Sequence, residues 1–132
     1  MLKNYFDLIR VPQWIKNLFV FVPLLFSMHF FESDYFIISL KAFFIFCLAS
    51  SFIYVINDLV DLEADANHPK KKNRPLPSGK ISKKSAVILS VVILFIFFGL
   101  AFDTNVEFKY FLTAFVILNA FLFFLFQTHC YT

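Results

Sequence analysis

The chain has 132 residues, of which 60% are hydrophobic and 21% aromatic, and its formal net charge is +3. Ordinary soluble chains are nearer half apolar, and the mean hydropathy of +0.75 favours the bilayer as the solvent. The two isolated cysteines, Cys47 and Cys130, form neither a disulfide framework nor a paired metal motif. The composition therefore predicts a membrane protein and excludes a disordered or disulfide-stabilised one.

Four apolar segments follow one another along the chain and predict about four membrane spans. They are Leu18–Phe31, Phe36–Ile56, Ala86–Phe102 and Phe108–Phe126. Lys41 interrupts the second near one end, where a long side chain can reach the interface. A backbone in lipid must satisfy its own hydrogen bonds, and the four runs do not alternate as barrel strands do. We therefore expect an all-α, multi-pass transmembrane helical bundle.

Basic residues are concentrated before the first span and after the second. Residues 1–17 and the loop 57–85 together contain ten of the twelve Lys and Arg residues. Four spans place both segments and the C-terminus on one side, and the positive-inside rule makes that side cytoplasmic. We therefore expect a multi-pass protein of the plasma membrane whose loop 57–85 faces the cytoplasm.

An acidic cluster directly follows the second span. Asp58, Asp61 and Asp65 are spaced i, i+3, i+7, so on a helix their carboxylates lie on one face. Mg²⁺ prefers oxygen ligands and bridges carboxylates to phosphate oxygens. The cluster therefore suits an enzyme that displaces a diphosphate, whose growing negative charge must be neutralised. The alternative is a solvated, structural helix end, but Asn57 follows the span directly and places the carboxylates at the mouth of the bundle.

The segment 68–79, which comes next, is rich in Lys, Arg and Pro. Its three prolines and one glycine prevent a regular helix, so we expect an ordered loop. Its basic side chains can hold phosphate oxygens beside the carboxylates; the alternative is a patch that contacts anionic lipid headgroups. His68 is more typical of a residue that hydrogen-bonds within a loop than of a ligand.

A polar group also precedes the first span. Trp14 is typical of an interfacial anchor. Gln13, Lys16 and Asn17 fall on one helical stripe at i, i+3, i+4. Polar groups that enter a span are costly unless they face protein or a cavity. We therefore expect this stripe to face the same polar cavity as the acidic cluster.

These three motifs together resemble the UbiA superfamily of membrane prenyltransferases. The residues that match its first aspartate motif, NDxxDxxxD, are Asn57, Asp58, Asp61 and Asp65. The segment 68–79 matches a second pattern, HPxKxxRPxxSG. The start QWIKNLFVFVPL, at 13–24, is similar to the branch represented by decaprenyl-phosphate phosphoribosyltransferase. The likeness covers about residues 8–80.

The resemblance implies a helical bundle with a cytoplasmic active site, Mg²⁺ as the cofactor, and a polyprenyl substrate. For this branch it implies transfer of 5-phosphoribosyl from phosphoribosyl diphosphate to a polyprenyl phosphate, among membrane lipids and without nucleic acid. The metal-binding residues that it implies are Asp58, Asp61 and Asp65, the first two being catalytic. The substrate-binding residues that it implies are Lys16, Asn17, Asn57, Lys71 and Arg74.

The family also has further spans and a second Asp-rich motif, which residues 86–132 do not contain. We therefore expect residues 1–132 to be the N-terminal part of a larger UbiA-like domain, truncated or frameshifted, with little or no turnover alone. Two alternatives stay open. One is an aromatic prenyltransferase of the 4-hydroxybenzoate type, in which the diphosphate leaves from the prenyl chain. The other is an inactive membrane fragment.

Overall fold

The computed structural model describes the backbone of residues 1–130 and the side chains of residues 1–126, and this part of the chain is helical without strands. The long helices are α3 (Ser33–Val60), α5 (Lys83–Ala101) and α6 (Val106–Cys130). The shorter elements are α1 (Leu2–Leu8), the 3-10 helix η1 (Val11–Phe21), α2 (Val22–Phe26), α4 (Leu62–Ala66) and the 3-10 helix η2 (Lys71–Asn73). The expected all-α class is confirmed.

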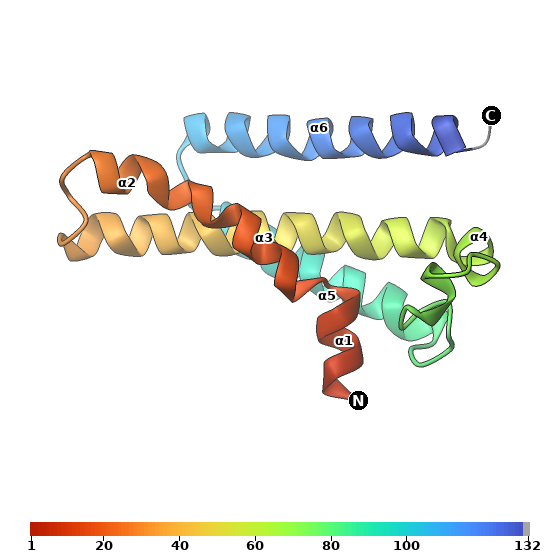
Figure 1. The fold of residues 1–132 in the computed structure, drawn as a ribbon. Coiled ribbons are helices and arrows are strands. Elements are labelled where there is room, and N and C mark those ends of the chain that lie inside the picture. The colour runs from red at the N-terminus through yellow and green to blue at the C-terminus, as the bar shows by residue number, and fades with distance from the viewer. Residues whose placement is uncertain (131–132) are drawn as a thin grey trace.

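Helix α3 is the centre of the bundle. In Figure 1, η1 crosses in front of it, α5 packs behind it, and α6 runs beside it. Helix α3 packs against α5, and small buried residues on the two helices, Ala49 on α3 and Ala86 and Ala101 on α5, are of the kind that lets helix backbones approach closely. Most of the apolar surface of α6 is exposed. The packing therefore centres on α3, which passes through the whole length of the bundle.

Three of the expected spans are confirmed as helices, and the first is wrong in its extent. Helices α3, α5 and α6 are each long and apolar enough to cross a membrane. The expected helix over Leu18–Phe31 instead begins at Val11 as a 3-10 helix and ends at Phe26. Pro12 and Pro23 lie at the starts of η1 and α2, where each removes an amide donor and interrupts a continuous α-helix. This segment qualifies as a span only together with α1, from which it is bent by 53°.

A row of hydrogen bonds joins the N-terminal segment to α3. Trp14 Nε1 donates to Ser51 Oγ at 2.9 Å, and Ser51 Oγ donates to the Ile9 carbonyl at 2.8 Å. Farther along, Asn17 Nδ2 donates to Ser50 Oγ at 3.4 Å. Residues three apart in a 3-10 helix lie above one another. Trp14 and Asn17 therefore both face α3, and Trp14 is more than an interfacial anchor.

An apolar cluster holds α1 and the loop 67–82 against the C-terminal half of α3. Its buried members are Leu8, Val55, Leu76, Ile81 and Ala86. Burial of one large aliphatic side chain contributes about 1.5–3 kcal/mol. Leu8 and Val55 are fully buried, so α1 is fixed close to the last turns of α3. This packing brings the polar residues of the N-terminus and of the loop to one end of the bundle.

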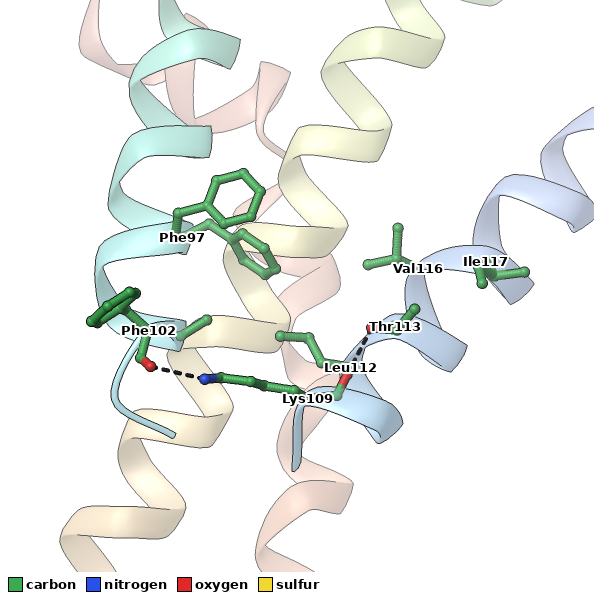
Figure 2. A pocket seen from close by; sticks show the side chains of 9 residues that line it. Phe97, Phe102, Lys109, Leu112, Thr113, Val116 and Ile117 are labelled. Carbon is green, nitrogen blue, oxygen red and sulfur yellow. Dashed lines mark hydrogen bonds between the residues drawn. The ribbon is translucent and has the colours of Figure 1, made fainter. Parts of the chain in front are cut away.

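The other end of α5 carries an apolar pocket and an ion pair. The pocket, of about 470 Å³, lies between α5 and α6, and Figure 2 shows Lys109 reaching across it to the Phe102 carbonyl, at 2.9 Å. Lys41 of α3 pairs with Asp103 in the α5–α6 connection. The hydrogen bond and charge of Lys41 hold the pKa of Asp103 below its usual value. These contacts fasten the helices together far from the loop 57–85.

The two ends of α3 provide a test of the topology. Asp34 lies at the start of this 28-residue helix, and Ser78 follows its other end. At 1.5 Å per residue the helix is about 42 Å long, which exceeds the ~30 Å of a hydrocarbon core. With Asp34→Cys and Ser78→Cys made singly, we expect a membrane-impermeant maleimide to label only position 34 on intact cells. The parent chain supplies the background from its native cysteines. Labelling of both positions from outside would contradict the topology.

Candidate functional site

Two buried carboxylates converge on one arginine at the C-terminal end of α3. Asp58 and Asp65 are each 3% exposed. Arg74 Nη1 lies 3.4 Å from Asp58 Oδ1 and 3.2 Å from Asp65 Oδ2, and Lys71 Nζ lies 3.5 Å from Asp65 Oδ1. A buried carboxylate needs a paired charge because its desolvation alone is costly. The acidic cluster and the basic loop therefore form a single site.

The helix that the spacing of the three carboxylates assumes is interrupted at Asp61, whereas a common face for Asp58, Asp61 and Asp65 stays a prediction. Helix α3 ends at Val60, and α4 begins at Leu62. Asp61 forms the junction, with φ −90° and ψ 12°, and is partly exposed. Across the junction the Asp61 amide donates to the Asn57 carbonyl at 3.0 Å and the Asp65 amide to the Asp61 carbonyl at 2.8 Å, and the Arg74 guanidinium contacts both Asp58 and Asp65. The assignment of Asp61 as a metal ligand stays a prediction.

The loop that carries the basic residues is held by its own hydrogen bonds. His68 Nδ1 accepts from the backbone amides of Lys70 at 3.2 Å and Lys71 at 3.3 Å, so its expected role within the loop is confirmed. Gly79 turns the chain with a φ of +80°, a conformation that favours glycine. The Ser78 amide donates to the Arg74 carbonyl at 3.0 Å. The loop therefore fixes the backbone from which Arg74 reaches the carboxylates.

Arg10 belongs to the same site, although its sequence position gives little sign of it. Arg10 Nη2 lies 2.9 Å from Asp58 Oδ1, and its guanidinium stacks 4.5 Å from the centre of the Tyr54 ring. Arg10 separates α1 from η1 and has a left-handed φ of 54°. Sequence reasoning counted it only among the basic residues of the cytoplasmic side. The sole available signal was a charged residue directly before an apolar segment, because its partner is 48 residues away.

Asn57, Asp58 and Asp65 offer oxygen atoms of the kind that a hard divalent cation prefers. Asn57 Oδ1 is buried and has no hydrogen-bond partner within the described part of the chain; such an orphaned oxygen suits a cation ligand. Among the residues that the structure describes, no three His, Cys, Asp or Glu side chains are placed to hold a metal ion by themselves. The residues that would hold Mg²⁺ are Asn57, Asp58 and Asp65, with further oxygens from a phosphorylated ligand.

Lys16 and Asn17 are not brought to the carboxylates. Lys16 is exposed, whereas Asn17 is 5% exposed and contacts Ser50 and, at 3.5 Å, the Cys47 sulfur. Ser50 precedes Asp58 by eight residues on α3, about 12 Å along the helix. The expectation of a polar stripe facing the acidic cluster is therefore wrong, because it assumed an α-helical period where the chain is a 3-10 helix. The substrate-binding assignment of both residues stays a prediction.

Comparison with known proteins places this site in a family. The sequence model of the UbiA prenyltransferase family matches residues 17–132. Decaprenyl-phosphate phosphoribosyltransferase of Mycolicibacterium smegmatis is 44% identical over 86 residues, which cover 62% of this chain and 27% of that protein. 4-Hydroxybenzoate octaprenyltransferase of Blochmanniella pennsylvanica is 45% identical over 51 residues, 39% of this chain and 18% of that protein.

A solved structure has the same helical arrangement. A structure of digeranylgeranylglyceryl phosphate synthase superposes with a TM-score of 0.71 at 33% identity, covering 93% of this chain and 42% of that one. The present chain thus matches less than half of that structure and less than a third of the two curated relatives. The family match extends over most of the chain, and the fold agrees with it. The chain belongs to the UbiA prenyltransferase family.

Proposed function

We propose that this chain provides the diphosphate-binding part of a membrane transferase that moves 5-phosphoribosyl from phosphoribosyl diphosphate to a polyprenyl phosphate. The observation that carries the proposal is the meeting of buried Asp58 and Asp65 with Arg74 and Lys71. Carboxylates for a divalent cation and cations for phosphate oxygens are the two requirements of a metal–diphosphate site. The similarity to decaprenyl-phosphate phosphoribosyltransferases favours phosphoribosyl as the transferred group.

The proposed chemistry assigns a role to each side chain. Asn57, Asp58 and Asp65, and by the family resemblance Asp61, would hold Mg²⁺, which would supply positive charge to neutralise the leaving diphosphate. Lys71 and Arg74 bind phosphate oxygens. The bond between ribose C1 and the diphosphate breaks with its electron pair on the diphosphate, and a polyprenyl phosphate oxygen bonds to C1. The loop 57–85 lies on the cytoplasmic face of the plasma membrane, where a water-soluble donor is accessible.

A second candidate is prenyl transfer to an aromatic acceptor. Its support is the 45% identity to a 4-hydroxybenzoate octaprenyltransferase, over 51 residues. The same carboxylates and cations would then hold the diphosphate of the prenyl donor. The two candidates differ in the donor and acceptor and not in the diphosphate site, so substrate assays must separate them.

Two chimeras test the choice between these reactions. Residues 1–132 replace the matching segment of the Mycolicibacterium phosphoribosyltransferase in one and of the Blochmanniella octaprenyltransferase in the other. Each membrane preparation receives labelled phosphoribosyl diphosphate with polyprenyl phosphate, or polyprenyl diphosphate with 4-hydroxybenzoate, plus Mg²⁺. We expect product only from the first chimera with the first substrate pair, and none after Asp58→Asn. Product only from the second chimera would establish prenyl transfer, and inactivity of both would refute the transferase proposal.

A further inference from the structure

We propose that Arg10 is a phosphate-binding residue of this site, and that it leaves Asp58 for a phosphate oxygen when a Mg²⁺–diphosphate group binds. The inference rests on the proposed function and adds to it a residue from the N-terminal segment, outside the two motifs of the loop. It also assigns the contact between Arg10 and Asp58 to the ligand-free state of the site.

The first support is the sharing of one carboxylate oxygen. Asp58 Oδ1 is the partner of both Arg10 Nη2, at 2.9 Å, and Arg74 Nη1, at 3.4 Å. A divalent cation on Asp58 draws on the negative charge of the same carboxylate, because carboxylate oxygens are its preferred ligands. A cation on Asp58 therefore competes with both guanidinium groups. The guanidinium groups of Arg10 and Arg74 remain charged, and the oxygens of the diphosphate that binds the cation can accept hydrogen bonds from them.

The second support is the balance of charge. Three cations, Arg10, Lys71 and Arg74, surround the two buried carboxylates Asp58 and Asp65. This group alone has an excess of one positive charge, which an anionic ligand would neutralise. Arginine has five N–H donors, and the contact with Asp58 is made by Nη2. The planar fork of an arginine suits a ligand that accepts several hydrogen bonds, as a phosphate does.

The third support is the position of Arg10 at the edge of the site. The side chain of Arg10 is 25% exposed, whereas that of Asp58 is 4% exposed. Arg10 is therefore the more accessible partner of this ion pair. Its backbone is held on both sides: Leu8 is fully buried, and the Ile9 carbonyl accepts from Ser51 Oγ. The guanidinium also makes a cation–π contact with the face of the Tyr54 ring. Arg10 is therefore oriented before a ligand arrives, and only its outer atoms need to move.

The single tryptophan of the chain reports on this movement. Trp14 lies four residues after Arg10, and its Nε1 is bound to Ser51 of α3. We would titrate the full chain in lipid nanodiscs with inorganic diphosphate at fixed Mg²⁺ and follow Trp14 fluorescence. Arg10→Asn removes the charge but keeps a residue that tolerates positive φ, and Arg10→Lys keeps the charge without the planar fork. Lys3→Gln is the matched control, because Lys3 is an exposed cation of α1.

We expect Arg10→Asn to weaken diphosphate binding at least tenfold, Arg10→Lys to lie between it and the parent, and Lys3→Gln to match the parent. A structural ion pair predicts the opposite sign, because loss of Arg10 frees Asp58 for Mg²⁺. Binding by Arg10→Asn equal to or tighter than Lys3→Gln would therefore overturn the inference and leave the proposed function standing. A ligand-free emission of Arg10→Asn that differs from the parent would indicate a changed fold near Trp14. The diphosphate affinity of Arg10→Lys is then compared with that of Lys3→Gln instead. No binding by the parent would overturn both proposals.

Discussion

Asp58→Asn will remove the Mg²⁺-dependent part of diphosphate binding, which we expect to weaken the affinity in Mg²⁺ by about 100-fold or more. Metal–phosphate bridging is worth several kcal/mol, and each ~1.4 kcal/mol is a factor of ten. The substitution keeps the shape of the side chain and removes the charge that Arg10 and Arg74 share. Isothermal titration calorimetry with inorganic diphosphate, with and without Mg²⁺, measures both affinities.

The metal-free titration distinguishes loss of the metal ligand from collapse of the site. Without Mg²⁺, the variant has the same three cations and one carboxylate fewer, so diphosphate should bind as tightly as to the parent or more tightly. Asp34→Asn is the matched control, because Asp34 is an exposed carboxylate in the first turn of the same helix. A Mg²⁺ effect that is undiminished in Asp58→Asn, and equal to that of Asp34→Asn, would remove Asp58 from the metal site.

Ser51→Ala will have the largest effect on stability among the polar residues between the N-terminal segment and α3. The Ser51 side chain is fully buried and makes two hydrogen bonds, accepting from Trp14 Nε1 and donating to the Ile9 carbonyl. Each buried group left without its partner costs about 1–3 kcal/mol. Because two groups lose their partner, we expect the free energy of unfolding to fall by about 2–6 kcal/mol. Denaturation in mixed micelles, followed by Trp14 emission, measures this change.

A second serine of α3, Ser39, provides the control for the loss of a serine hydroxyl from this helix. Ser39 lies near the other end of α3 and makes no side-chain hydrogen bond to the N-terminal segment among the described residues. Ser39→Ala should therefore change the free energy of unfolding by less than about 0.5 kcal/mol, as is usual away from such contacts. The ligand-free Trp14 emission of Ser51→Ala should also differ from the parent, because its Nε1 loses its partner. Equal unfolding midpoints for the two variants would show that Ser51 does not hold the segment.

The sequence by itself determined the membrane character and three of the four spans. A run of about twenty apolar residues in lipid has one way to satisfy its backbone, so hydropathy alone predicts α3, α5 and α6. The first span was predicted less well, because its backbone depends on Pro12 and Pro23 and on the left-handed turn at Arg10. Hydropathy does not distinguish a bent 3-10 segment from a straight α-helix.

The sequence also indicated which charged residues after α3 lie close enough to form one ligand-binding site. Asp58, Asp65, Lys71 and Arg74 lie within 17 residues of one another, so short-range geometry was enough to bring them together. Only the tertiary structure decided that the helix is interrupted at Asp61 and that Arg74 contacts both carboxylates. A helix junction depends on how the loop packs as well as on the spacing of the acids.

The contribution of the N-terminal segment was decided by the tertiary structure alone. Arg10 reaches Asp58 across 48 residues and Trp14 reaches Ser51 across 37, and no local pattern encodes either pairing. The 3-10 period turns Asn17 toward Ser50 and away from the carboxylates, which reverses the expectation from an α-helical stripe. Local sequence fixes which groups are polar, but the burial of Leu8 and Val55 in one core fixes which of them meet.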